Sequence, residues 1–115
     1  MPFLKIETNA EKLNDSQANA FIAAASELVS GLLEKPERYI MVSYQHNPDM
    51  MFDGKNNALA YVELKSLGLN EEQTTEYAAK ICNFVKETLD VSPDRIYIEF
   101  TNAERHLWGW DNKTF

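Results

Sequence analysis

With 115 residues, 44% of them hydrophobic, the chain has enough apolar side chains to form one domain and is short for two. Eighteen acidic residues against eleven basic ones give a net charge of −7, which argues against nucleic acid and anionic membranes as partners. Cys82 is the single cysteine, so no internal disulfide can form, and no apolar run approaches the length of a membrane helix. With no secretory pattern at the start of the chain, these features predict a cytoplasmic protein and leave non-classical secretion open.

The first strand-like run begins with a proline. Pro2 follows the initiator Met1 and opens a run that extends to Thr8. Methionine is usually trimmed before a small second residue, which would give Pro2 a free secondary amine. Such an amine can act as a base where burial or a nearby cation lowers its pKa from the ordinary value of about 8. Proline is also tolerated at the first residue of a strand, and position alone favours this simpler interpretation.

Two segments have the spacing of amphipathic helices. Asp15 or Ser16 can cap the first, whose apolar positions continue to Leu32. Asn70 can cap the second, which opens with acidic residues and continues to Thr88.

Each predicted helix lies between two strand-like runs. The runs are residues 2–8 and 39–45 around the first helix, and 58–65 and 95–101 around the second. A Pro-acid-Arg tripeptide precedes the later strand of each pair, 57 residues apart. We therefore predict an α+β fold in a single domain, with β-α-β repeats at 1–57 and 58–115 forming a four-stranded mixed sheet with both helices on one face.

The composition of two strands bears on assembly. Residues 39–42 and 58–62 are almost continuously apolar, which is typical of strands buried on both faces. Two helices can cover only one face, so another subunit is predicted to cover the second, in an obligate oligomer. Residues 47–57 are predicted to be a loop, and the aromatic segment 108–115 is predicted to pack on a neighbour.

Several short motifs together resemble the macrophage migration inhibitory factor family. They are Met1-Pro2, Lys35-Pro36, Ser66-Leu67-Gly68, the run Ser-Pro-Asp-Arg-Ile-Tyr-Ile at 92–98, and the run Gly-Trp-Asp-Asn-Lys-Thr-Phe at 109–115. The resemblance covers the whole chain. It implies a homotrimer of the tautomerase superfamily, with active sites at subunit interfaces that interconvert the keto and enol forms of aryl keto acids such as phenylpyruvate. It also makes the catalytic interpretation of Pro2 the better one.

The resemblance assigns roles to individual residues. Pro2 corresponds to the catalytic base, and Lys35 to a pocket lysine that binds the substrate carboxylate and disfavours protonation of Pro2. Tyr97 corresponds to a tyrosine supplied by the neighbouring subunit. The remaining matches to the family's pocket lining are Ser66, Leu67, Tyr39 and Phe115. Without the resemblance, Lys35 reads as a solvated lysine near a helix end, and the aromatic residues read as packing.

Three positions depart from the family pattern. Glu99 replaces an asparagine that reaches aromatic substrates, and Trp108 replaces a smaller apolar residue at the rim, so both are expected to alter the range of substrates. Residues 59–62, Leu-Ala-Tyr-Val, stand where the family has a Cys-x-x-Cys motif, so thiol oxidoreductase chemistry is not expected.

No cofactor or metal is expected. His46 and His106 are isolated, and Asp49 and Asp53 lack the other ligands of a calcium loop. The function predicted is a cofactor-independent keto–enol tautomerase that takes a small keto acid. The alternatives are a cytokine-like module with a vestigial site, whose partner is a protein receptor, and a pocket that Glu99 redirects to hydration or dehalogenation.

Overall fold

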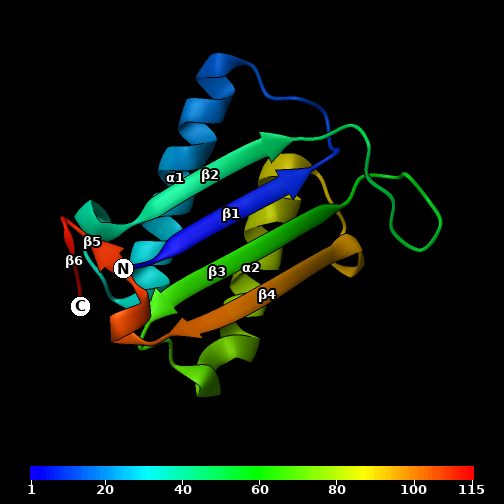
Figure 1. Cartoon of the computed structure of the whole chain (residues 1–115). Helices are drawn as coiled ribbons and strands as arrows, with labels where there is room; N and C mark the ends of the chain where they lie inside the picture. The colour runs from blue at the N-terminus through cyan, green and yellow to red at the C-terminus, as the bar shows by residue number, and fades with distance from the viewer.

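The protein is a four-stranded sheet with two helices packed against one face (Figure 1). The computed structural model describes residues 1–115. Its strands are β1 (Phe3–Thr8), β2 (Met41–His46), β3 (Ala60–Leu67) and β4 (Ile96–Ala103), and they lie in the order β2-β1-β3-β4. β1 is parallel to β2 and antiparallel to β3, and β3 is parallel to β4. The predicted mixed sheet is therefore confirmed.

The helices are α1 (Asp15–Leu33), which joins β1 to β2, and α2 (Thr74–Leu89), which joins β3 to β4. Neither combines the length and apolar character needed to cross a bilayer. Each half of the chain thus contributes one β-α-β unit, and both crossovers cover the same face of the sheet (Figure 1).

The predicted cap of α1 is wrong by one or two residues. Asn14, not Asp15 or Ser16, caps the helix: its side chain accepts a hydrogen bond from the Gln17 N–H at 2.8 Å. The Gln17 side chain in turn accepts from the Asn14 N–H at 3.0 Å. This reciprocal pair of hydrogen bonds satisfies two backbone N–H donors. It explains why Asn14 is the cap, although two adjacent polar residues could also have capped the helix.

The second predicted cap, Asn70, lies one short turn before α2. Its side chain accepts from the Glu72 N–H at 3.1 Å and opens a 3₁₀ turn at Glu71–Gln73, after which the α-helix begins at Thr74. The sequence thus located the start of the helical segment, and the tighter first turn shifts the α-helix by three residues.

The hydrophobic core lies between the sheet and the helices. Alternate residues of the central strands, including Leu4 and Ile6 on β1, are fully buried. Ile81 and Val85 of α2 pack in the same cluster, together with Phe21 of α1. The two periodicities, 2 in the strands and 3.6 in the helices, therefore face one another across a single core.

The face of the sheet without helices carries both apolar and polar side chains, and the single protomer leaves Met41 and Tyr97 on it 66% exposed. Tyr39 belongs to a 3₁₀ turn, and β3 begins only at Ala60, so the apolar runs combine turn residues with strand residues. Within the strands, alternation leaves polar side chains on the face without helices. The charged ones are Lys5, Glu7, Glu63, Lys65 and Glu99.

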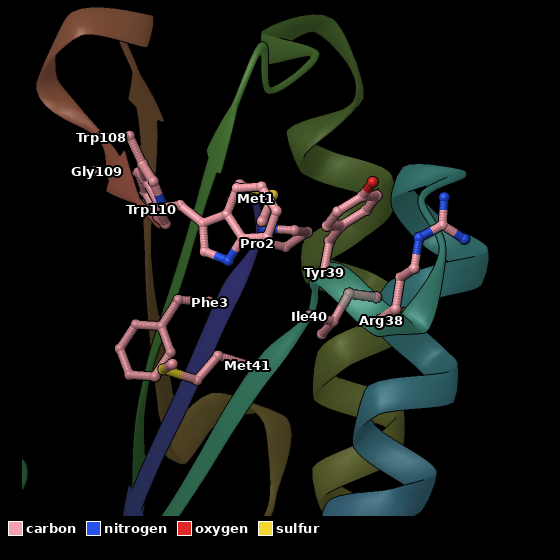
Figure 2. A pocket seen from close by; sticks show the side chains of 10 residues that line it. All are labelled: Met1, Pro2, Phe3, Arg38, Tyr39, Ile40, Met41, Trp108, Gly109 and Trp110. Atoms are coloured by element: carbon pink, nitrogen blue, oxygen red, sulfur yellow. The ribbon is translucent and has the colours of Figure 1, made fainter. Parts of the chain in front are cut away.

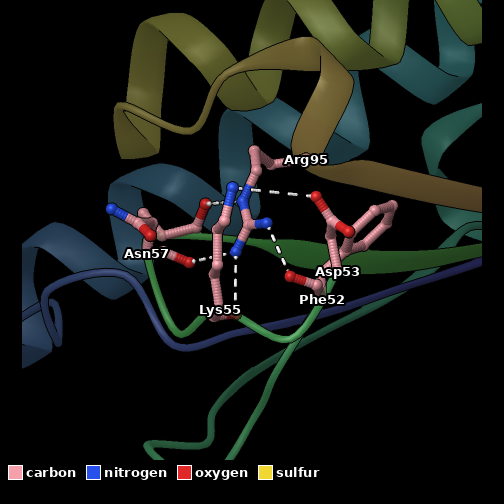
Figure 3. Close-up of polar contacts among 6 residues, drawn as sticks. Phe52, Asp53, Lys55, Asn57 and Arg95 are labelled. Atoms are coloured by element: carbon pink, nitrogen blue, oxygen red, sulfur yellow. Dashed lines mark hydrogen bonds and ion pairs between the residues drawn. The ribbon is translucent and has the colours of Figure 1, made fainter.

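Arg95 holds the long loop between β2 and β3 against the start of β4 (Figure 3). Its guanidinium donates to four backbone carbonyls, those of Phe52 at 2.8 Å, Lys55 at 3.0 Å, Asn57 at 2.8 Å and Ala58 at 3.4 Å. One planar cation therefore satisfies acceptors spread over seven residues of loop.

The carboxyl-terminal aromatic segment packs on its own chain. β5 (Gly109–Trp110) pairs with β6 (Lys113–Thr114) in a hairpin whose two turn residues have positive φ, 52° for Asp111 and 65° for Asn112. Aspartate and asparagine tolerate this conformation better than most residues. The hairpin places Trp110 over the start of the chain, as described next.

Candidate active site

Pro2 lies at the beginning of the central strand β1 and is fully buried. Its carbonyl accepts a hydrogen bond from the Met41 N–H at 3.0 Å, which extends the pairing of β1 with β2 by one residue. Because proline has no N–H, the first strand residue is the position where it costs the sheet nothing. The start of the chain is thereby fixed inside the fold instead of extending into solvent.

Lys35 brings a cation to this end of the sheet. The residue follows α1, which ends where Glu34 adopts a left-handed conformation. Lys35 Nζ donates to the Leu67 carbonyl at 2.7 Å and to Ser66 Oγ at 3.1 Å, at the end of β3. Since β3 runs antiparallel to β1, its end lies beside Pro2. Lys35, Ser66 and Leu67 therefore contact one another at this end of the sheet.

Two basic nitrogens meet at this point. Burial lowers the pKa of the amino-terminal amine, and the positive charge of Lys35 and a hydrogen bond from it lower that pKa further. Burial also lowers the pKa of Lys35, an effect that its hydrogen bond with the amine opposes. The amine in this structure is that of Met1. A nitrogen at the start of the chain therefore loses its proton more readily than an amine in water.

A cavity of about 230 Å³ opens beside Pro2 (Figure 2). It is lined by Met1, Pro2, Phe3, Arg38, Tyr39, Ile40, Met41, Trp108, Gly109 and Trp110. Most of these residues are apolar, and none is acidic. The cavity thus combines an apolar wall with the buried start of the chain, an arrangement suited to a small ligand with an apolar part.

Aromatic rings form one wall of the cavity. The Tyr39 and Trp110 rings meet edge to face with centroids 6.3 Å apart, and Trp110 stacks on Phe115 at 6.1 Å. The Phe115 N–H donates to the Trp108 carbonyl at 3.2 Å and ties the last residue to the hairpin. Of the predicted residues, Tyr39 and Trp108 line the cavity with Pro2, and Phe115 stacks on Trp110. Lys35, Ser66 and Leu67 are not among the lining residues.

Tyr97 and Glu99 lie elsewhere in the protomer. Tyr97 pairs with Tyr61, which pairs with Glu7, so it lies five residues along the sheet from Pro2. At about 3.3 Å per residue this is about 16 Å. The Tyr97 side chain is 66% exposed, and its ring packs on Phe52 with centroids 4.7 Å apart.

Glu99 belongs to a polar cluster on the face of the sheet without helices. Its carboxylate accepts from the Tyr61 hydroxyl at 2.7 Å, and the same hydroxyl lies 3.1 Å from a Glu63 oxygen. The hydrogen bond to Glu99, with the charge of both carboxylates, raises the pKa of Tyr61 above its ordinary range. Glu99 therefore has a partner of its own within the protomer.

Arg38 and Trp110 are among the cavity residues to which the sequence analysis assigns no role. Arg38 was noticed only as part of a repeated Pro-acid-Arg tripeptide, whose second copy contains the loop-binding Arg95. Trp110 was noticed only as part of the carboxyl-terminal motif. The repeated motif alone could not show that Arg95 binds a loop while Arg38 lines a cavity, because this difference depends on the residues that pack beside each arginine.

Comparison with known proteins agrees with this geometry. The model of the macrophage migration inhibitory factor (MIF) family matches residues 1–115. The chain belongs to this family. It is 30% identical to a MIF homolog of Brugia malayi and 28% identical to MIF of Mus musculus, covering 100% of this chain and 99% of each relative. MIF membership confirms the resemblance predicted from sequence, and the family includes both tautomerase activity and cytokine-like roles.

Solved MIF structures have the same fold. The homologue from Prochlorococcus marinus superimposes with a TM-score of 0.91 at 35% identity over 98% of both chains. The Toxoplasma gondii MIF gives 0.88 at 27% identity over 98% of this chain and 99% of that one. A tautomerase-type fold supports isomerase chemistry at a general level.

Proposed function

We propose that this chain is a keto–enol tautomerase for small keto acids such as phenylpyruvate, with Pro2 as its general base and acid once Met1 is removed. The observation that carries the proposal is the buried start of the chain: Pro2 is fully buried, and the Met1 amine beside Lys35 has a lowered pKa. Removal of Met1 exposes the Pro2 amine to the same surroundings. Membership of the MIF family supports the same class of reaction.

The reaction requires one proton to be moved between carbon and oxygen. A neutral Pro2 nitrogen takes the proton from the carbon next to the substrate ketone, which leaves an enolate and a protonated proline. The same proton then passes to the enolate oxygen, giving the enol and the neutral base. Lys35, which bonds to Ser66, Leu67 and the Met1 amine, has one N–H released when Met1 is removed, and this group stabilises the negative charge of the substrate. Neither a metal nor a cofactor takes part.

The aromatic wall supplies the apolar part of the site. A phenyl ring of the substrate packs against Tyr39, Trp108 and Trp110, where the cavity offers apolar surface beside Pro2. Exclusion of water from this region keeps the base neutral, because desolvation disfavours the protonated amine.

The proposed assembly is a homotrimer in which a neighbour completes each site. MIF-family neighbours suggest an oligomer, and the separation of Tyr97 from Pro2 along the sheet prevents both from meeting one small substrate in a single protomer. A second copy that packs its Tyr97 end against the cavity supplies this tyrosine together with Glu99.

The test of the proposed base is the Pro2→Gly variant, which keeps a terminal amine but loses the ring and the secondary nitrogen. We expect kcat/KM for phenylpyruvate to fall by about 100-fold or more, the usual contribution of a general base. Pro48→Gly, the same change in an exposed part of the long loop, serves as the control. Intact-mass measurement on each preparation establishes that Met1 is absent. Undiminished turnover by the processed Pro2→Gly protein would exclude Pro2 as the base.

A further inference from the structure

The side chains that line the cavity beside Pro2 carry a positive charge, whereas the chain as a whole is negatively charged. The molecule has eighteen acidic and eleven basic residues, yet no acidic residue lines the cavity, and Arg38 is its one charged side chain. A site with this lining attracts anions although the protein as a whole repels them.

Arg38 is held in place by an aromatic ring and has no acidic partner. Its guanidinium carbon lies 4.7 Å from the centroid of the Tyr39 ring, a cation–π contact. None of the ion pairs of the structure includes it. Arg95, in contrast, has its N–H groups bonded to the carbonyls of the loop. The N–H groups of Arg38 are therefore available to a ligand, in an orientation already set by Tyr39.

Arg38 lines the cavity, whereas Lys35 does not. Lys35 Nζ lies at the end of β3 and uses two of its N–H groups on Ser66 and Leu67. Figure 2 shows the Tyr39 ring between Pro2 and the Arg38 guanidinium, which places the guanidinium at the rim. Arg38 is thus one aromatic ring further from Pro2 than the inner part of the cavity.

We propose that Arg38 is a second anion-binding group that favours keto acids with a negatively charged substituent at the end remote from the carbon that Pro2 deprotonates. This inference rests on the proposed tautomerase function. The aromatic part of such a substrate lies along Tyr39 and Trp110, and its distal carboxylate receives two parallel N–H bonds from the guanidinium. The preferred substrate class is therefore a dianionic aryl keto acid.

The experiment compares two substrates across matched variants. Phenylpyruvate and 4-carboxyphenylpyruvate differ only in the distal carboxylate. For each protein we take the ratio of kcat/KM for the two. Arg38→Gln is expected to lower the ratio of dianion to monoanion by about tenfold, the effect of one lost charge-assisted hydrogen-bonded contact. Arg38→Lys is expected to restore part of it, since a lysine keeps the charge but not the planar fork.

The control is Lys86→Gln, which removes one positive charge from an exposed site on α2. Its ratio is expected to equal that of the unmodified protein. Equal loss in both variants would mean that net charge, and not Arg38, attracts the dianion, and an unchanged ratio in Arg38→Gln would equally overturn the inference.

A binding measurement separates this inference from the proposed function. Phenylacetate and 4-carboxyphenylacetate cannot react, and their binding is followed by the fluorescence of Trp108 and Trp110 in the cavity wall. Tighter binding of the dicarboxylate that disappears in Arg38→Gln supports the anion site even if the protein turns over neither keto acid. Equal binding of both probes to the unmodified protein contradicts the anion site even if tautomerase activity is present.

Discussion

Lys35 is the charged residue expected to influence the protonation of the proposed base. Burial, the cation of Lys35 and its hydrogen bond all lower the pKa of the Met1 amine, and we expect the same groups to act on the Pro2 amine once Met1 is removed. A base must be neutral to accept a proton, so activity is lost as the pH falls through the pKa of the amine. Each contribution that lowers the pKa extends activity to lower pH.

Replacing Lys35 with Met tests this electrostatic role. Loss of the cation raises the pKa of the amine, so the acidic limb of the kcat/KM profile for phenylpyruvate moves to higher pH. Lys86→Met, which removes an exposed charge from α2, leaves the limb in place. A variant with lower activity but an unmoved limb would restrict Lys35 to binding the substrate.

Of the residues that line the cavity, the sequence predicted Pro2, Tyr39 and Trp108, but it did not predict the contacts among the site residues. Lys35 and Ser66 are 31 residues apart, and only the antiparallel pairing of β1 with β3 brings them together. Arg38 was missed because its role depends on the Tyr39 ring beside it, which no spacing in the chain encodes. Motif matching thus identifies residues that belong to a family pattern. It does not identify a charged residue at the rim of a cavity, because that position depends on how the side chains pack.

At the scale of elements, Arg95 connects a long loop to β4. Arg95→Met removes the donor of four carbonyl acceptors while it keeps much of the side chain's apolar length. We expect a loss of about 2–3 kcal/mol in the free energy of unfolding, because part of this backbone then has no partner. Urea unfolding at fixed protein concentration measures it.

Lys55→Met is the matched control for this loop. Its ammonium lies 3.9 Å from the Asp53 carboxylate, and both side chains are largely exposed, so the pair contributes little. A change of about 0.5 kcal/mol or less is expected. If Arg95→Met were equally harmless, water would be replacing the guanidinium at these carbonyls, and the loop would not depend on it.

The elements that sequence predicted best are those with a strong period. Alternation in β1 and the 3.6-residue spacing in α1 and α2 correspond to buried positions of the structure. The apolar runs near Tyr39 and Ala58 were misleading, because residues in turns were counted as strand residues. Periodicity reports burial reliably only where the backbone conformation is already known to be regular.

At the scale of the whole molecule, the distribution of site residues favours an assembly. Pro2 and Tyr97 lie at opposite ends of the sheet, and the face between them is polar, with a cluster of Tyr61, Glu63 and Glu99. The family resemblance predicts that a neighbouring subunit supplies Tyr97, although no spacing within the chain indicates this. Because Pro2 and Tyr97 lie far apart within one protomer, they can meet at one site only between two subunits.

Mixing two defective chains tests the statement. Pro2→Gly lacks the base, and Tyr97→Ala, expected to lower kcat/KM by about tenfold, lacks the residue proposed to come from a neighbour. When the two variants are co-expressed with different tags, about one third of the sites in each trimer that contains both chains combine an intact Pro2 with an intact Tyr97. Phenylpyruvate turnover of the purified mixed trimers therefore exceeds the mean of the two variants assembled alone. If both residues acted within one protomer, no mixed site would be intact, and mixing would only average the two activities.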